Sequence, residues 1–357
     1  MERRSSRRVK VGKIFIGGDS PITIQSLTNT DTHNIDATYD QTMRLCEAGC
    51  DIVRITAPDL ASVRTFEVLK ARGVQVPLVA DIHFSYEIAI ACAESGVDKI
   101  RINPGNIGSE DKVAAVVDAC RKSGTPIRIG VNSGSLEKHI LARHGAPTAA
   151  ALAESALYHA SLLEALDYRD VILSVKASNT RNMIEANRIL AEKTSYPLHL
   201  GVTEAGGGDS AIVKSSIGIG ALLSSGIGDT IRVSLTDDPV NEVYAAREIL
   251  RALDLTANPG MDVVSCPTCG RTKINLIPLV SEFKERVRKE GLDRLNIKVA
   301  LMGCAVNGPG EAREADLGIA GGDGEGLIFK KGEILRKVSE DRLLDELILE
   351  IKRLTEG

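Results

Sequence analysis

The sequence predicts an α/β protein with an N-terminal (β/α)8 barrel, similar to a TIM barrel, and a smaller C-terminal α/β domain. Eight short apolar runs recur in the first two-thirds of the chain, with segments of helical period between them. Near-continuous apolar strands are typical of a parallel sheet covered on both faces, and eight strand–helix units most simply close into a barrel. A Pro/Gly-containing linker and a cysteine-bearing segment follow. We therefore expect two domains, at residues 1–255 and 261–357.

The eight expected strands are those apolar runs, at residues 22–26, 51–56, 77–82, 99–103, 127–131, 171–176, 198–203 and 230–235. A small hairpin is expected before them, from Val9 onward, because apolar residues alternate around a turn. Asp238 and Pro239 are expected to begin the last barrel helix. The alternative is an open doubly wound sheet. It usually carries a Gly-x-Gly-x-x-Gly loop after its first strand, which Leu27–His33 does not provide.

The composition favours an ordinary globular protein and excludes several partners. Of 357 residues, 43% are hydrophobic and 26% charged, with a net charge of −4, so nucleic acid is not an expected partner. No apolar run approaches the ~18 residues needed to cross a membrane. The basic residues 1–8 lack the apolar region of a secretory signal and are expected to form a solvated tail. An odd number of cysteines indicates a reducing, cytoplasmic location.

The C-terminal domain is expected after a linker at Asp254–Gly260. A helix is predicted at Leu276–Lys289, followed by strands near 297–302, 316–320 and 327–336. A final amphipathic helix is expected from Ser339. Its apolar face would carry Leu343, Leu344, Leu347, Ile348 and Ile351.

Three cysteines of this domain form a candidate metal centre. Cys266 and Cys269 make a Cys-x-x-Cys pair, and Cys304 lies in a later glycine-rich loop. Three thiolates suit an iron–sulfur cluster or zinc. No cysteine follows Cys304 and the last histidine is His199, so a usual fourth zinc ligand is missing here. Glu311 is the best-placed oxygen donor, and it would be a weak and exchangeable ligand.

The other four cysteines are expected to be small buried apolar residues within barrel helices. They are Cys46, Cys50, Cys92 and Cys120.

A second signal comes from basic residues within the expected barrel strands, near their carboxyl ends. These are Arg54, Arg101, Arg128, Lys176 and Arg232. A buried unpaired charge costs several kcal/mol, so these groups need anions. Carboxylates of the barrel are one source. An anionic ligand is the other, and five converging cations suit two phosphates, because the guanidinium fork matches phosphate oxygens.

Further polar residues follow the same strands, at the barrel end where TIM barrels carry their active sites. The candidate ligand contacts are Asp81, His83, Asn103, Asn132 and Ser234. Glu204 is the candidate acid/base group, because a carboxylate among so many cations can move a proton. The glycines at 206–208 could present backbone N–H groups to phosphate, although a flexible turn has the same pattern.

The linker also predicts an assembly. The last barrel helix should end at the bottom face, and about seven residues span at most ~25 Å. This length does not carry a folded domain around to the barrel mouth. We therefore expect a head-to-tail homodimer in which each active site is shared between chains.

Nearly the whole chain resembles the family of 4-hydroxy-3-methylbut-2-enyl diphosphate synthases, which depend on flavodoxin or ferredoxin. The most specific segments are Ala80-Asp-Ile-His-Phe84, Ile100-Arg-Ile-Asn-Pro-Gly-Asn106, Arg128-Ile-Gly-Val-Asn-Ser-Gly-Ser-Leu136, Gly201-Val-Thr-Glu-Ala-Gly206, Ile231-Arg-Val-Ser-Leu-Thr-Asp-Asp238, Cys266-Pro-Thr-Cys-Gly270 and Gly303-Cys-Ala-Val-Asn-Gly-Pro-Gly-Glu311. The large middle insertion of plant members is absent, which indicates the two-domain bacterial type.

The resemblance implies a C-terminal iron–sulfur domain with a [4Fe–4S] cluster on Cys266, Cys269, Cys304 and Glu311. It implies reductive dehydration and ring opening of 2-C-methyl-D-erythritol 2,4-cyclodiphosphate, on the methylerythritol phosphate route to isoprenoids. The five cations would hold the diphosphate, Glu204 would supply a proton to departing water, and Asn307 would contact the substrate. Flavodoxin or ferredoxin would deliver electrons to a homodimer whose cluster domains cover the partner's barrel.

One rival interpretation is a non-redox barrel transferase that binds a phosphate or pterin ligand and carries a structural zinc module. It explains the barrel residues but gives no reason for the missing His or Cys ligand. Counting iron, acid-labile sulfide and zinc distinguishes the two.

Overall fold

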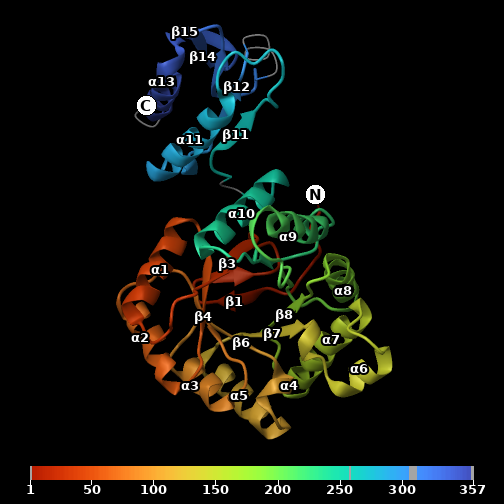
Figure 1. The fold of residues 1–357 in the computed structure, drawn as a ribbon. Helices are drawn as coiled ribbons and strands as arrows, with labels where there is room; N and C mark the ends of the chain where they lie inside the picture. Colours follow the sequence, from red (N-terminus) through yellow and green to blue (C-terminus); the bar gives the residue numbers. More distant parts are fainter. Residues whose placement is uncertain (1, 257–258, 305–311, 355–357) are drawn as a thin grey trace. The chain divides into compact units, whose positions relative to one another are not determined.

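A computed structural model describes residues 2–256, 259–304 and 312–354. The chain forms two compact units, Met1–Thr256 and Ala257–Gly357, which are shown as ribbons in Figure 1. Each unit has its own apolar core.

The first unit contains an eight-stranded parallel sheet in the order β8-β7-β6-β5-β4-β3-β10-β9. Its strands are β3 Thr23–Leu27, β4 Ile52–Thr56, β5 Leu78–Asp81, β6 Lys99–Ile102, β7 Ile127–Asn132, β8 Val171–Lys176, β9 His199–Leu200 and β10 Thr230–Ile231. A parallel bridge between Leu173 and Leu198 joins the two edges of the sheet. The predicted TIM-like barrel is confirmed.

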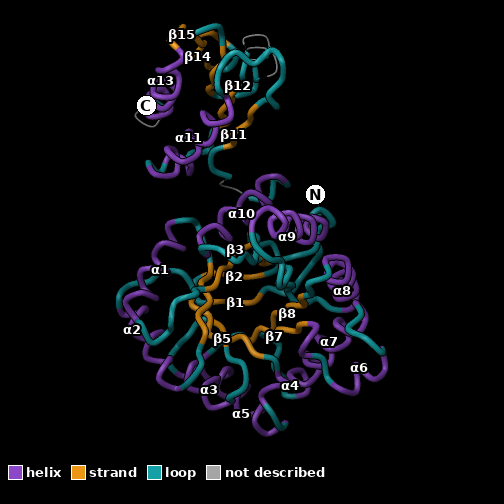
Figure 2. The backbone as a smooth tube through the Cα atoms, viewed as in Figure 1, coloured by secondary structure: helices purple, strands orange, loops and turns teal. Residues whose placement is uncertain are grey.

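Helices surround this sheet, as the ring of purple segments around the orange strands shows in Figure 2. They are α1 Ile35–Glu47, α2 Val63–Ala71, α3 Tyr86–Glu94, α4 Pro104–Ile107, α5 Glu110–Ser123, α6 Lys138–His144, α7 Ala149–Ala165, α8 Thr180–Lys193, α9 Gly208–Leu223 and α10 Pro239–Ala252. Asp238 caps α10 as predicted, accepting a hydrogen bond from the Val240 amide at 3.0 Å.

Successive side chains along each strand point alternately into two environments. One set of apolar side chains, such as Val53 and Ile55, belongs to the large core that includes helix residues. The other set begins with Ile52, Val79 and Ile172, which pack in one cluster with the predicted N-terminal hairpin, β1 Val9–Val11 and β2 Ile14–Ile16. Since these residues lie at the starts of their strands, the hairpin closes the barrel at that end.

The basic tail differs from expectation, because it is bound rather than solvated. Arg3 pairs with Asp229 at 3.2 Å, and Arg4 donates hydrogen bonds to the backbone oxygens of Thr194 and Tyr196. Asp229 in turn accepts the amide of Leu198 at 2.8 Å. The arginines therefore fasten the tail beside the start of β9, a role that its charge pattern did not reveal.

The second unit is a five-stranded sheet in the order β11-β12-β13-β14-β15. Its elements are β11 Asp262–Ser265, α11 Leu276–Lys289, β12 Lys298–Met302, β13 Leu317–Gly321, β14 Glu325–Lys330, β15 Glu333–Ser339 and α13 Leu343–Arg353. The first three strands are parallel and the last three antiparallel. This confirms the smaller C-terminal α/β domain, with α11 at its predicted bounds.

Two details of this unit differ from the sequence analysis. The single strand expected at 327–336 is a hairpin, because the chain turns at Lys331 and Gly332, both with positive φ. The short strand β11 was not predicted. The five apolar residues expected on one face of the last helix are all buried.

Candidate functional site

The five predicted cations lie in one region of the barrel. Arg54, Arg101 and Arg128 come from β4, β6 and β7, Lys176 ends β8, and Arg232 follows β10. By strand alternation they lie on the face opposite the residues that pack against the helices. They are also close enough to repel one another, because the charge of Arg232 acts on Arg54, Arg128 and Lys176, and that of Arg101 acts on Arg54 and Arg128. The arrangement places positive charge from five strands inside the barrel.

Two carboxylates neutralise part of this charge. Asp81 lies 3.7 Å from Nε of Arg54 and 3.3 Å from a terminal nitrogen of Arg101. Glu242, on the first turn of α10, binds Arg232 through both oxygens, at 3.0 and 3.2 Å. Glu242 was missed by the sequence analysis because it lies on a helix, where an acidic residue normally faces solvent.

A deeper layer of polar groups was also missed. Lys99 is fully buried, and its ammonium donates to Oε1 of Gln25 at 3.3 Å. The same oxygen accepts from Arg128 at 3.2 Å. His199, also fully buried, lies beside Thr230. The two-residue repeat of a strand could have revealed Lys99, because it lies two residues before Arg101 on the same strand and therefore on the same face.

The barrel interior therefore has an excess of positive charge. Among the described residues, six cations (the five predicted groups and Lys99) face two carboxylates, Asp81 and Glu242. Within the described residues the Lys176 ammonium forms no ion pair and no hydrogen bond, and Nε of Arg54 and Nε of Arg128 are buried without a hydrogen-bond partner. Such groups suit an anionic ligand with several oxygens.

The pKa values of Asp81, Arg54 and Lys176 reflect their burial and the excess of positive charge. Burial alone would raise the pKa of Asp81, but the charges of Arg54 and Arg101 outweigh it and lower that pKa to about 2. Burial lowers the pKa of Arg54 to about 10 despite its pairing with Asp81. Burial, and then the charge of Arg232, lowers the pKa of Lys176 well below its usual value.

Asn103 belongs to the same end of the barrel. It is 2% exposed, and its Oδ1 accepts the Gly105 amide at 3.0 Å as the cap of α4. Its Nδ2 is buried and has no hydrogen-bond partner among the described residues. A donor is therefore left available beside the cations.

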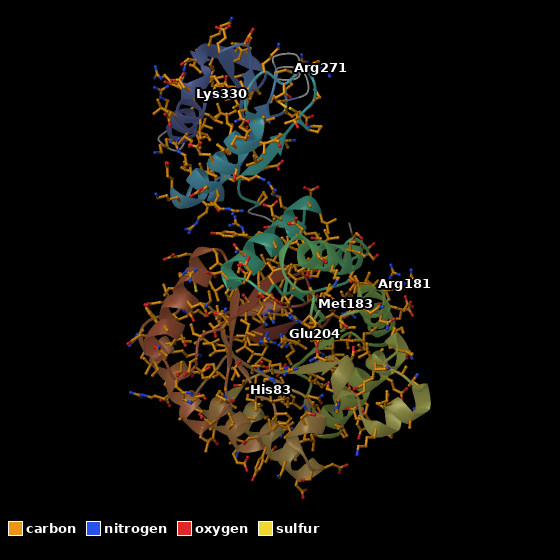
Figure 3. All side chains as sticks on the ribbon, in the orientation of Figure 1. His83, Arg181, Met183, Glu204, Arg271 and Lys330 are labelled. Carbon is orange, nitrogen blue, oxygen red and sulfur yellow. The ribbon has the colours of Figure 1, made fainter. Side chains whose placement is uncertain are left out.

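Other predicted contacts are less enclosed. Asn132, the last residue of β7, and Ser234, three residues after β10, are half-buried. His83 and Glu204 are exposed on the loops after β5 and β9, and Figure 3 shows both inside the outline of the helix ring. Glu204 has a positive φ of 53°, a backbone conformation that is costly for a residue with a side chain. Neither residue belongs to the buried ion-pair group.

The three C-terminal cysteines lie on loops that follow neighbouring strands. Cys266 comes directly after β11, and Cys304 follows its parallel neighbour β12. Sγ of Cys266 accepts the Gly303 amide at 3.2 Å, and the Gly303 oxygen accepts the Lys273 amide at 2.8 Å. The loop carrying Cys266 is therefore tied to the loop carrying Cys304.

The thiols fit a metal or iron–sulfur group in their chemistry. All three are free, and hydrogen bonds from the backbone and side chain of Arg271 lower the pKa of the Cys269 thiol, which favours a thiolate. Within the described residues, no three Cys, His, Asp or Glu side chains form a ready metal-binding group. The predicted residues Glu311 and Asn307 lie outside the described residues.

The remaining cysteines are structural, with one correction. Cys92 and Cys120 are buried in α3 and α5, and burial raises the pKa of each thiol to about 12. Cys46 is half-buried near the end of α1. Cys50 is not helical, because α1 ends at Glu47. It is buried just before β4, where burial raises its pKa.

Together these features define a (β/α)8 barrel with a buried excess of cations, joined to an α/β domain that carries free thiols on its loops. Residues 6–247 match the GcpE TIM-barrel domain, and residues 262–353 match the GcpE protein C-terminal domain. The chain belongs to the GcpE family, which confirms the family resemblance. None of its described helices is long and apolar enough to cross a membrane.

Close relatives cover nearly the full chain. A protein of Clostridium perfringens is 56% identical over 348 residues, 98% of each chain. One of Clostridium tetani is 54% identical over 354 residues, 99% of this chain and 100% of the relative. Both are named 4-hydroxy-3-methylbut-2-en-1-yl diphosphate synthase (flavodoxin). A solved structure of Plasmodium falciparum HPPK-DHPS matches with a TM-score of 0.50 and 12% sequence identity. The match covers 71% of this chain and 50% of that chain, and it shows the fold alone.

Proposed function

We propose that the chain is a flavodoxin-dependent 4-hydroxy-3-methylbut-2-en-1-yl diphosphate synthase, an iron–sulfur oxidoreductase of the methylerythritol phosphate pathway. It would convert 2-C-methyl-D-erythritol 2,4-cyclodiphosphate to the open-chain diphosphate. Two electrons enter the substrate, a ring carbon–oxygen bond breaks, and one hydroxyl leaves as water. The observation that carries the proposal is the buried excess of cations in a barrel whose relatives carry this name.

The cations bind the two phosphates. Lys176 and the Nε atoms of Arg54 and Arg128, which have no hydrogen-bond partner among the described residues, supply N–H donors for phosphate oxygens. Asp81 holds the guanidinium groups of Arg54 and Arg101, and Glu242 holds that of Arg232, so these three groups are preorganised. Arg101 and Arg232 complete the site. As the ring opens, the released phosphate oxygen gains charge in a field that is already positive.

The polar residues around this group orient the sugar portion. Asn103 donates through its free Nδ2, while His83, Asn132 and Ser234 add contacts at the ends of their strands. Glu204 supplies the proton for the departing hydroxyl. Its exposure and its independence of the buried ion pairs leave its carboxyl free to exchange protons with solvent.

The C-terminal domain, residues 261–357, would hold a [4Fe–4S] cluster on Cys266, Cys269, Cys304 and Glu311. When bound, the cluster supplies single electrons and a Lewis-acidic site. The Gly303 amide stabilises negative charge on Cys266, and Arg271 does so on Cys269. Asn307, four residues before Glu311 in the sequence, would contact the substrate.

The proposed partners are an electron-donor protein and a second copy of the chain, and the proposed location is the cytoplasm. Flavodoxin, the donor named for the relatives, or a ferredoxin would deliver the two electrons one at a time. Residues 1–255 would bind substrate in one chain while the cluster domain of a second chain closes the site, giving a head-to-tail homodimer. A cytoplasmic location fits a reduced cluster and a small-molecule substrate.

An anaerobic purification tests the proposal against a barrel transferase with a zinc module. We expect about four iron and four sulfide per chain, and formation of the open-chain diphosphate with reduced flavodoxin. One zinc per chain without sulfide would instead support the module.

A further inference from the structure

A hydrogen-bonded His–Glu pair lies outside the cation group and has no part in the mechanism above. His159, on α7, is fully buried, and its Nε2 is hydrogen-bonded to Oε1 of Glu137, the residue before α6. Nδ1 of His159 and Oε2 of Glu137 are buried with no hydrogen-bond partner in the described part of the chain. Replacing both partners of a buried hydrogen bond by apolar groups of the same shape can be nearly neutral for stability, so stability alone does not account for the pair.

This pair packs directly against Gly105. A Cβ atom built on Gly105 would lie 3.1 Å from Cε1 of His159 and 3.2 Å from Oε1 of Glu137. Only a glycine therefore fits without displacing one of the two side chains. The His159–Glu137 pair therefore packs against the backbone of α4 at the α-carbon of Gly105.

Gly105 connects the pair to Asn103. The Gly105 amide donates to Oδ1 of Asn103 at 3.0 Å, and the Asn106 amide donates to the Asn103 backbone oxygen at 2.9 Å. The bond to Oδ1 fixes the orientation of the side-chain amide, and its Nδ2, which has no partner among the described residues, is the donor that a phosphate oxygen can accept from. Asn103 is extended after β6, so alternation places it on the same face as Lys99 and Arg101.

We propose that the His159–Glu137 pair is a positioning element of the substrate site. It holds the α4 turn so that Asn103 presents its amide donor to an oxygen of the bound diphosphate. The inference rests on the proposed function, because it needs Asn103 to contact that ligand. His159 itself touches no substrate.

A double-mutant cycle on the full-length protein tests this coupling. Affinity for the cyclic diphosphate is measured by calorimetry, and kcat and KM are measured alongside. We expect Asn103→Ala to weaken binding about tenfold, since a hydrogen bond to a charged oxygen is lost. His159→Ala should weaken it about fivefold in the natural chain and less than 1.5-fold in the Asn103→Ala background. Additive losses would overturn the proposal.

Three variants separate positioning from general loss of structure. His159→Gln retains a donor for Glu137 and should restore affinity to within about twofold. Gly105→Ala should reproduce the His159→Ala loss through the opposite side of the contact. His144→Ala is the matched control, because His144 pairs with Glu154 at 2.7 Å on the same two helices. It should leave affinity unchanged, and an equal loss there would contradict the inference.

The outcome also distinguishes this inference from the proposed function. If the natural chain binds the diphosphate but Asn103→Ala binds equally well, the positioning role fails while the function stands. If the natural chain does not bind the diphosphate, the proposed function fails first. Should His159→Ala not fold, His159→Gln and Gly105→Ala complete the cycle.

Discussion

Lys176→Met should stabilise the free protein while weakening its binding of diphosphate. The Lys176 side chain is almost fully buried and has no ion pair within the described residues. Burial, and then the charges of Arg232 and Arg54, lowers its pKa, so its charged form is costly in the free protein. Methionine has a similar length and removes this cost without leaving an unpaired carboxylate.

The magnitude follows from these environments. Replacing buried charges by apolar groups commonly stabilises a protein by about 1–4 kcal/mol. For a domain of this size, each kcal/mol raises Tm by about 2–4 °C. A hydrogen bond to a charged group contributes about 1.5–3 kcal/mol, so affinity for diphosphate should fall about 10- to 150-fold.

Arg232→Met is the matched contrast. Glu242 would be left buried without its bidentate partner, although it still accepts hydrogen bonds from Ser26 and from the Leu235 amide. Breaking a buried pair costs about 3–5 kcal/mol, so Tm should fall rather than rise. Both variants lose binding, but their stabilities move in opposite directions.

The assay combines scanning calorimetry of the ligand-free variants with titration of pyrophosphate and of the cyclic diphosphate at fixed salt. Fixed ionic strength is needed because salt screens the cations. The reasoning is refuted if Lys176→Met lowers Tm and leaves both affinities unchanged, because Lys176 would then serve the fold.

Three further predictions concern pH, proton transfer and assembly. The folded pKa of Asp81, about 2, lies below its unfolded value, so its stabilisation is full above about pH 5 and lost as pH falls toward 2; Asp81→Asn should flatten this acid limb in calorimetry. Glu204→Gln should lower kcat at least about 100-fold and change the calorimetric affinity for the cyclic diphosphate less than about threefold, since Glu204 pairs with no buried cation; a large loss of affinity would argue against a proton-transfer role. Mixing Cys304→Ala chains with Glu204→Gln chains should restore about a quarter of native activity, because half of the dimers would carry one intact shared site of two. No recovery after verified subunit exchange would exclude the shared site.

Local sequence patterns were enough to predict the barrel, from its eight apolar runs, and the five cations within or beside its strands. Arg54, Arg101 and Arg128 each lie between apolar residues in a strand, and this pattern has few other interpretations. The apolar stripe of the last helix was predictable for the same reason, because its burial follows a simple helical period.

The partners of the charged side chains could not be predicted, because they lie far away in the sequence. Glu242 binds Arg232 only because α10 packs against β3, which lies next to β10 in the sheet, and Asp81 lies between two arginines from neighbouring strands. Likewise, the His159–Glu137 pair joins residues 22 apart in the sequence. A local pattern shows that a charge is present but not which partner it meets. Whether Lys176 lacks such a partner therefore required coordinates.

The account is tested most directly by anaerobic incubation of the purified protein with 2-C-methyl-D-erythritol 2,4-cyclodiphosphate and reduced flavodoxin. It predicts that 4-hydroxy-3-methylbut-2-en-1-yl diphosphate forms, with two electrons consumed for each product molecule. Recovery of unchanged cyclic diphosphate, from protein that holds iron and sulfide and binds the substrate, would contradict it.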